Sequence, residues 1–139
     1  MENIKEMKGA DMRTIKFRGK RIDMGEYWQY GNLKQTKTRG CFINSQDDKV
    51  YGSGVEVDPA TVGQFTGFHD KNGVEIYEGD IILHWVSRWP DKKYKGVVIY
   101  TDICAAFQYL YANSLNGNSR DFMHQPHGFE VIGNIHEGR

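Results

Sequence analysis

The sequence lacks a long apolar run that could span a membrane, a set of cysteines that could form several disulfides, and a net charge of either sign. It has no run of about 18 apolar residues, so it predicts no transmembrane helix and no membrane partner. Its two cysteines, Cys41 and Cys104, are too few for a disulfide framework, and we expect both to be reduced, buried thiols. The 18 basic and 18 acidic residues cancel, so no field of one sign guides the chain to nucleic acid.

The N-terminal segment also lacks the apolar core of a secretion signal, because it is rich in charged residues. We therefore expect a cytoplasmic protein. Residues 1–11 are expected to form an extension, helical or disordered, before the first strand-like segment. The chain length of 139 residues suits one domain, which we place at residues 12–139.

Proline is scarce, with 3 residues, whereas 16 glycines separate short runs that favour strands. This pattern predicts a mainly β fold, a small barrel or sandwich with few short helical segments. One such segment should begin at Asp58, a capping residue that precedes Pro59. The apolar run at 81–86 predicts a strand buried on both faces. Residues 105–115 fit a strand or a short helix, and residues 113–127 read as a polar loop.

Motifs for catalysis, metal binding or cofactor binding are missing. The sequence contains neither a nucleophile elbow nor a zinc-protease helix, and His124 and His127 are too few to close a zinc site. Glu75, Glu78 and Asp80 could act as acid and base or bind a divalent ion. A solvated hairpin rim explains these carboxylates more simply. We therefore expect a protein that is not an enzyme, with no catalytic residue, no metal and no cofactor.

Basic side chains gather in two segments, residues 16–21 and 88–95, and the second also carries aromatic rings. Cations can bind phosphates while aromatic faces stack on bases, so these segments are candidates for nucleic-acid binding. Charge runs are also common on solvated faces, which keeps the alternative open. The candidate residues are Lys16, Arg18, Lys20, Arg21, Arg88, Trp89, Lys92 and Lys93.

Aromatic residues are abundant, with 8 Tyr, 7 Phe and 3 Trp. This is more than the interior of a barrel of this size needs. Tyr and Trp side chains left on the surface favour subunit contacts. We therefore expect a homo-oligomer.

A long string, TVGQFTGFHDKNGVEIYEGDII at residues 61–82, resembles the signature of the YopX-like proteins of phages and prophages. Blocks at 16–21 (KFRGKR), 28–33 (WQYGNL), 95–100 (KGVVIY) and 129–137 (FEVIGNIHE) resemble the rest of that family. The resemblance implies a β-rich fold, similar to small SH3-like barrels in its C-terminal half. It brings no assigned function and no catalytic residues.

The signature itself can be explained by backbone geometry. Its glycines, Gly63, Gly67, Gly73 and Gly79, are expected where the chain turns, bulges or admits another backbone. Asp80 is expected to accept backbone N–H groups in its own turn. The sequence therefore favours a non-enzymatic accessory or protein-binding module that contacts a host or phage protein. The alternative is a nucleic-acid-binding protein that uses residues 16–21 and 88–95.

Overall fold

A computed structural model describes residues 13–47, 54–85, 93–113, 117–123 and 128–137. The described part of the chain is mainly β, as the sequence predicts, with one short 3-10 turn. Its elements are β1 (Phe17–Lys20), β2 (Trp28–Gln35), β3 (Cys41–Asn44), β4 (Val55–Val57), η1 (Pro59–Thr61), β5 (Gly63–His69), β6 (Glu75–Tyr77), β7 (Asp80–Trp85), β8 (Lys93–Thr101), β9 (Ala106–Asn113), β10 (Gly117–Phe122) and β11 (Phe129–Asn134). The expected extension at residues 1–11 lies outside the described residues.

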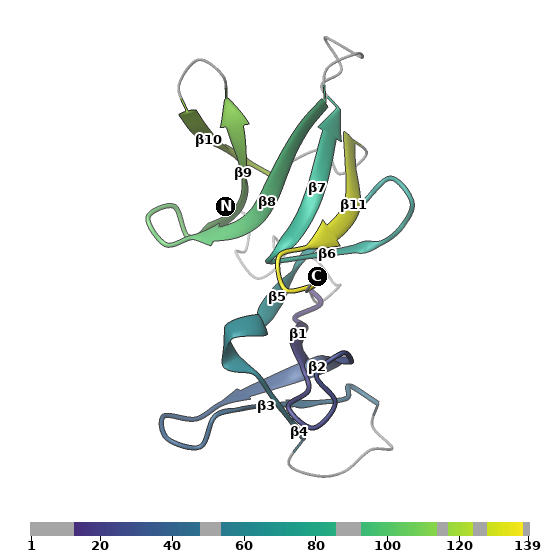
Figure 1. The fold of residues 1–139 in the computed structure, drawn as a ribbon, viewed down its shortest axis with the longest axis vertical. Helices are drawn as coiled ribbons and strands as arrows, with labels where there is room; N and C mark the ends of the chain where they lie inside the picture. Colours follow the sequence, from purple (N-terminus) through teal and green to yellow (C-terminus); the bar gives the residue numbers. More distant parts are fainter. Residues whose placement is uncertain (1–12, 48–53, 86–92, 114–116, 124–127, 138–139) are drawn as a thin grey trace, which may run out of the picture.

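The first sheet has six strands in the order β4-β3-β2-β1-β5-β6 (Figure 1). Neighbouring strands run antiparallel, and short hairpins join β1 to β2 and β5 to β6. Between β4 and β5 the chain makes the predicted helical turn. The side chain of Asp58 accepts a hydrogen bond from the Ala60 N–H at 3.0 Å, and Pro59 occupies the first position of the turn.

The second sheet has five antiparallel strands in the order β10-β9-β8-β7-β11. Residues 105–115, for which strand and helix were both open, contain strand β9. Residues 113–127, expected to be a loop, contain strand β10, so that expectation is wrong. β10 has a polar sequence without apolar alternation, and its pairing with β9 along Asn113 to Gln108 orders it as an edge strand.

Burial on β7 and at Cys104 differs from the expectations. On β7, Ile82 is fully buried while Ile81 and Leu83 are half-buried, so the strand is not fully buried on both faces. Both cysteines are free thiols, as expected. Cys41 is buried, but Cys104 is exposed, because it lies in the turn between β8 and β9.

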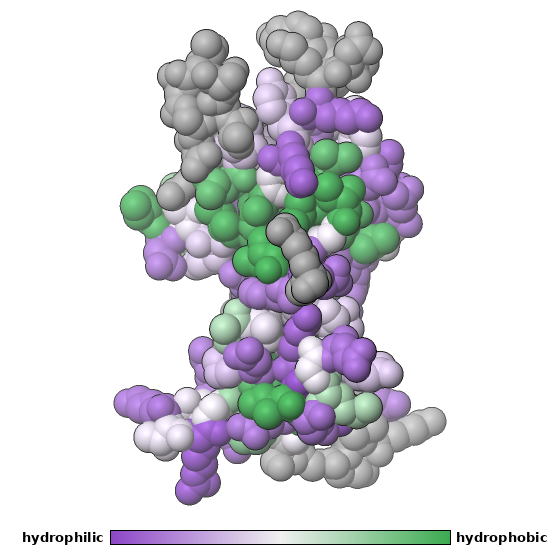
Figure 2. Space-filling view, viewed as in Figure 1, coloured by the Kyte–Doolittle hydropathy of each residue, from purple (hydrophilic) through white to green (hydrophobic). Residues whose placement is uncertain are grey.

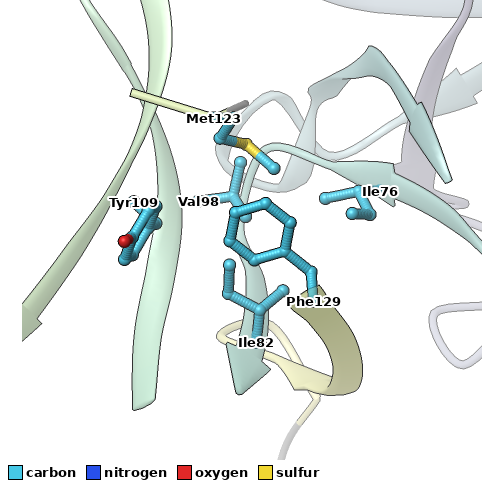
Figure 3. Packing of buried hydrophobic residues seen from close by; sticks show 6 residues of the cluster. All are labelled: Ile76, Ile82, Val98, Tyr109, Met123 and Phe129. Carbon is cyan, nitrogen blue, oxygen red and sulfur yellow. The ribbon is translucent and has the colours of Figure 1, made fainter. Parts of the chain in front are cut away.

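The main hydrophobic core lies on the five-stranded sheet and also draws the buried Ile76 and the partly buried Phe68 from the other sheet. Figure 3 shows the Phe129 ring among side chains of β7, β8 and β6. Ile76, from β6 of the six-stranded sheet, is 0% exposed in this core, so the β5–β6 hairpin packs against the second sheet. A smaller core on the first sheet is built from Cys41, Ile43 and Val57.

Neither sheet closes into a barrel among the described residues, because each retains two edge strands. These edges are β4 and β6 in one sheet and β10 and β11 in the other. Figure 2 shows that the molecule narrows between the two sheets and that hydrophilic side chains gather there on the visible face. Strands β1, β2, β6, β7 and β11 all reach this junction, where the candidate site lies.

Candidate functional site

An open cleft of about 380 Å³ lies at the junction of the two sheets. We call it the Arg18 cleft. Each sheet contributes to its walls, since β1, β2 and β6 come from one and β7 and β11 from the other. Its lining residues are Arg18, Trp28, Tyr30, Val74, Glu75, Tyr77, Asp80, Val131, Gly133, Asn134 and Glu137.

Arg18 is the central cation of the cleft and is only 6% exposed. Strand pairing places it opposite Tyr30 on β2. Its guanidinium carbon lies 4.5 Å from the centroid of the Trp28 ring and 4.9 Å from that of Tyr77. A guanidinium in this position is attracted by both ring faces. Its Nε atom is buried and has no hydrogen-bond partner among the described residues.

Asp80 is the anion that pairs with Arg18. Arg18 Nη2 donates to Asp80 Oδ1 at 2.7 Å, and the Tyr77 N–H donates to Asp80 Oδ2 at 2.8 Å. The second bond is the expected one within the turn, whereas the ion pair joins residues 62 positions apart. Burial raises the pKa of Asp80, and Arg18 and the Tyr77 N–H act in the opposite direction. With both oxygens accepting, the geometry is that of a carboxylate.

Glu75 is held by two partners at one end of the cleft. Lys16 Nζ donates to its Oε2, and the Tyr77 hydroxyl donates to its Oε1 at 3.1 Å. Burial and the nearby Glu75 charge raise the pKa of Tyr77, so this hydroxyl stays protonated as a donor. The Tyr77 hydroxyl therefore connects the Glu75 carboxylate to the rings of Trp28, Tyr30 and Tyr77, which we call the aromatic wall of the cleft.

Apolar and charged side chains at the rim remain open to solvent. Tyr30 is 45% exposed and Val74 is 47% exposed, although both line the cleft. The Tyr30 ring meets the Tyr77 ring at 65°, with 5.7 Å between their centroids. Glu137 is also exposed. The cleft therefore combines aromatic walls, a satisfied ion pair and an accessible carboxylate.

The basic residues of 16–21 are engaged by the protein itself. Lys16 pairs with Glu75, Arg18 with Asp80, and Arg21 with its neighbour Asp23. Lys20 Nζ donates to the backbone oxygen of His136 at 2.8 Å. Lys16 and Arg18 are therefore both paired with carboxylates that line the cleft, Glu75 and Asp80.

The second basic segment is described only at its end. Arg88, Trp89 and Lys92 lie outside the described residues. Lys93 begins β8, and its Nζ lies 5.1 Å from the centroid of the Trp85 ring. Of the candidate residues that the structure describes, Lys16, Arg18, Lys20 and Arg21 belong to or flank β1 of the six-stranded sheet, and Lys93 belongs to β8 of the five-stranded sheet.

Sequence reasoning identified Arg18, Glu75 and Asp80 but missed the aromatic wall and Glu137. Trp28 and Tyr30 are two positions apart in β2 and therefore lie on the same side of that strand, which is the local pattern that could have indicated an aromatic surface. Nothing local connects that strand with β6 or with Glu137. Among the described residues, no group of three His, Cys, Asp or Glu side chains could hold a metal ion.

Comparison with known protein families matches residues 16–138 to the YopX protein model. The chain belongs to the YopX protein family. The matched range includes every lining residue of the Arg18 cleft in this YopX-family chain. No curated protein gives a match. Within the described ranges, no helical segment has the length and apolar character that a membrane span requires.

Proposed function

We propose that this YopX-family chain is a non-enzymatic accessory protein whose Arg18 cleft binds a segment of another protein. The observation that carries the proposal is an open cleft with exposed aromatic and apolar rim residues around a buried cation. Recognition sites commonly combine a rigid aromatic wall with a few polar groups that set orientation. The Arg18 cleft has both.

The walls are already ordered before any ligand arrives. Arg18 is fixed by Asp80 and lies over the Trp28 and Tyr77 rings. Binding to such a surface immobilises few additional side chains, which lowers the entropic cost of association. The exposed Tyr30 ring then offers contact area with a small loss of rotamer freedom.

The engaged state of Glu75 and Asp80 supports a binding role over a catalytic one for these two carboxylates. Asp80 accepts from Arg18 and from a backbone N–H, and Glu75 accepts from Lys16 and Tyr77. A general base needs an accessible lone pair within reach of a substrate proton. The oxygens of both carboxylates are instead engaged by internal partners.

The remaining expectations from the sequence belong to the same proposal. We place the protein in the cytoplasm of a bacterial host, encoded by a phage or prophage, and self-associating. The four edge strands and the exposed aromatic rings of the described residues provide surface for contact between copies. Sedimentation velocity should show a species larger than a monomer, and a monomer at every concentration would contradict self-association.

The test is selection of binders from a yeast-displayed library of random peptides. Selected peptides should lose about tenfold or more in affinity for the Tyr30→Ala variant, since the substitution removes an exposed aromatic ring that the bound peptide would cover. Tyr27→Ala is the matched control, because Tyr27 is 56% exposed on the same hairpin but does not line the cleft. The proposal fails if no peptide is selected, or if Tyr30→Ala binds as tightly as the wild type.

Nucleic-acid binding remains a second candidate because two lysines flank one indole ring. Lys71 Nζ lies 4.0 Å from the Trp85 ring centroid, and Lys93 Nζ lies 5.1 Å from it. Mixed-sequence single- and double-stranded DNA should then bind with an affinity that falls steeply as salt rises. Lys92→Ala combined with Lys93→Ala should weaken this binding, and Lys34→Ala on the other sheet should leave it unchanged. Undetectable binding at low salt would eliminate this candidate.

A further inference from the structure

We propose that the peptide segment in the Arg18 cleft presents a Lys or Arg side chain to Tyr30 and Glu137. This inference rests on the proposed binding function and adds the chemistry of the ligand. The aliphatic stem of the side chain would pack on Tyr30 and Val74, and its charged end would lie beside Glu137. Long basic side chains bind in this way, because their stems are apolar while their ends are charged.

The protein already holds a cation of its own in this cleft. Arg18 lies 4.5 Å and 4.9 Å from two ring centroids, which shows that the wall is built to contact a cation. Tyr30 is the next ring outward, in edge contact with Tyr77 and 45% exposed. The electron-rich face of such a ring attracts a further cation.

The charge balance of the lining also favours a basic ligand. The lining contains one guanidinium, Arg18, and three carboxylates, on Glu75, Asp80 and Glu137. Arg18 neutralises Asp80, and Lys16 neutralises Glu75. Within the described ranges no ion pair involves Glu137. An acidic side chain entering the cleft would meet this charge and be repelled.

The other nearby cation, Lys20, forms no ion pair with Glu137 among the described residues. Lys20 Nζ lies 5.6 Å from the Trp28 ring centroid and donates to the backbone oxygen of His136. Its ammonium group is therefore engaged by the Trp28 ring and by a backbone carbonyl group and, within the described ranges, not by a carboxylate. On the Tyr30 side, with Val74, the described cations Lys16 and Arg18 are already paired with Glu75 and Asp80, and the exposed Tyr30 and Val74 side chains are open to a ligand.

The experiment uses the peptides that the random library yields against the wild-type protein. Most should contain Lys or Arg, and replacing that residue by Met should weaken binding about fivefold, because Met keeps the stem and removes the charge. Against Glu137→Gln the difference between the basic and the Met peptide should become smaller. Glu26→Gln, which removes an exposed carboxylate on the distant end of the β1–β2 hairpin, should leave the difference unchanged.

The outcomes separate the ligand chemistry from the binding function. If selected peptides lose affinity for Tyr30→Ala but are acidic or neutral, the basic ligand is wrong and the binding cleft stands. The basic ligand is equally wrong if the Met peptides bind as tightly as the basic ones. If no peptide depends on Tyr30, the proposed function itself fails, and this inference fails with it.

Discussion

The carboxylate of Asp70 joins the turn between β5 and β6 to strand β11. Oδ1 accepts from the N–H groups of Asn72 and Val74 at 2.8 and 2.9 Å, and Oδ2 accepts from the N–H of Val131 at 2.9 Å. The side chain is buried, at 6% exposure. Asp70→Ala should therefore lower the free energy of unfolding by about 2–4 kcal/mol, because it leaves several donors without an acceptor. Urea unfolding followed by circular dichroism measures this loss.

Asp70→Asn provides the control for shape at the same position. The amide keeps one acceptor oxygen in nearly the same volume but loses the charge and the second acceptor. We expect a loss of roughly half that of the alanine variant. Equal stability of the wild type and Asp70→Ala, within about 0.5 kcal/mol, would show that these bonds do not hold the turn.

At the scale of elements, the pairing of β2 with β3 depends on Gly31. Its φ is 146°, and a Cβ built at this position would lie 1.7 Å from the backbone oxygen of Asn44. No side chain can move aside to relieve that contact. Gly31→Ala should therefore destabilise the protein by about 2 kcal/mol or more, by separating the strands. The shift in the urea midpoint reports the effect.

Gly133 gives the comparison, because a Cβ there meets nothing within 4 Å. Gly133→Ala should change stability by less than about 0.5 kcal/mol. If the two alanine variants are equally stable, the close approach of β3 to Gly31 is not a constraint on the fold.

Local sequence patterns predicted most elements, while contacts between distant segments escaped them. The glycines of the 61–82 string behave as expected, since Gly67, Gly73 and Gly79 have φ values of 89°, 82° and 89°. In β9, Phe107, Tyr109 and Tyr111 alternate and pack on the core, so a signal for a strand was present. The polar β10 carried no such signal, because its order comes from backbone pairing with β9.

In the candidate site too, single residues could be predicted from the sequence, whereas the contacts between them could not. Arg18 and Asp80 were each singled out, one as a surface cation and one as a turn residue. Their pairing requires β1 and β7 to meet, and strands 62 residues apart leave no periodic trace of that contact in the sequence. The buried ion pair between Arg18 and Asp80 therefore becomes visible only in the folded structure.

At the scale of the whole molecule, His136 lies where the chain end returns to the first sheet. Its ring contacts Trp28 edge-on, with 6.1 Å between centroids, and its backbone oxygen accepts from Lys20. Burial lowers the pKa of His136, the positive charges of Arg18 and Lys20 lower it further, and Asp58 opposes them. The folded protein therefore favours the neutral ring.

Stability should consequently fall as the medium becomes acidic. Because the pKa in the unfolded chain stays near 6.5, the unfolded state binds a proton first, and stability is lost as pH falls through that value toward the lowered pKa. Between about pH 7 and pH 5 the loss from this group should be below about 1 kcal/mol, since the ring is partly exposed. His136→Gln should flatten the dependence of the urea midpoint on pH over this interval. Parallel pH profiles for the wild type and the variant would mean that the chain end and the first sheet are not coupled through this ring.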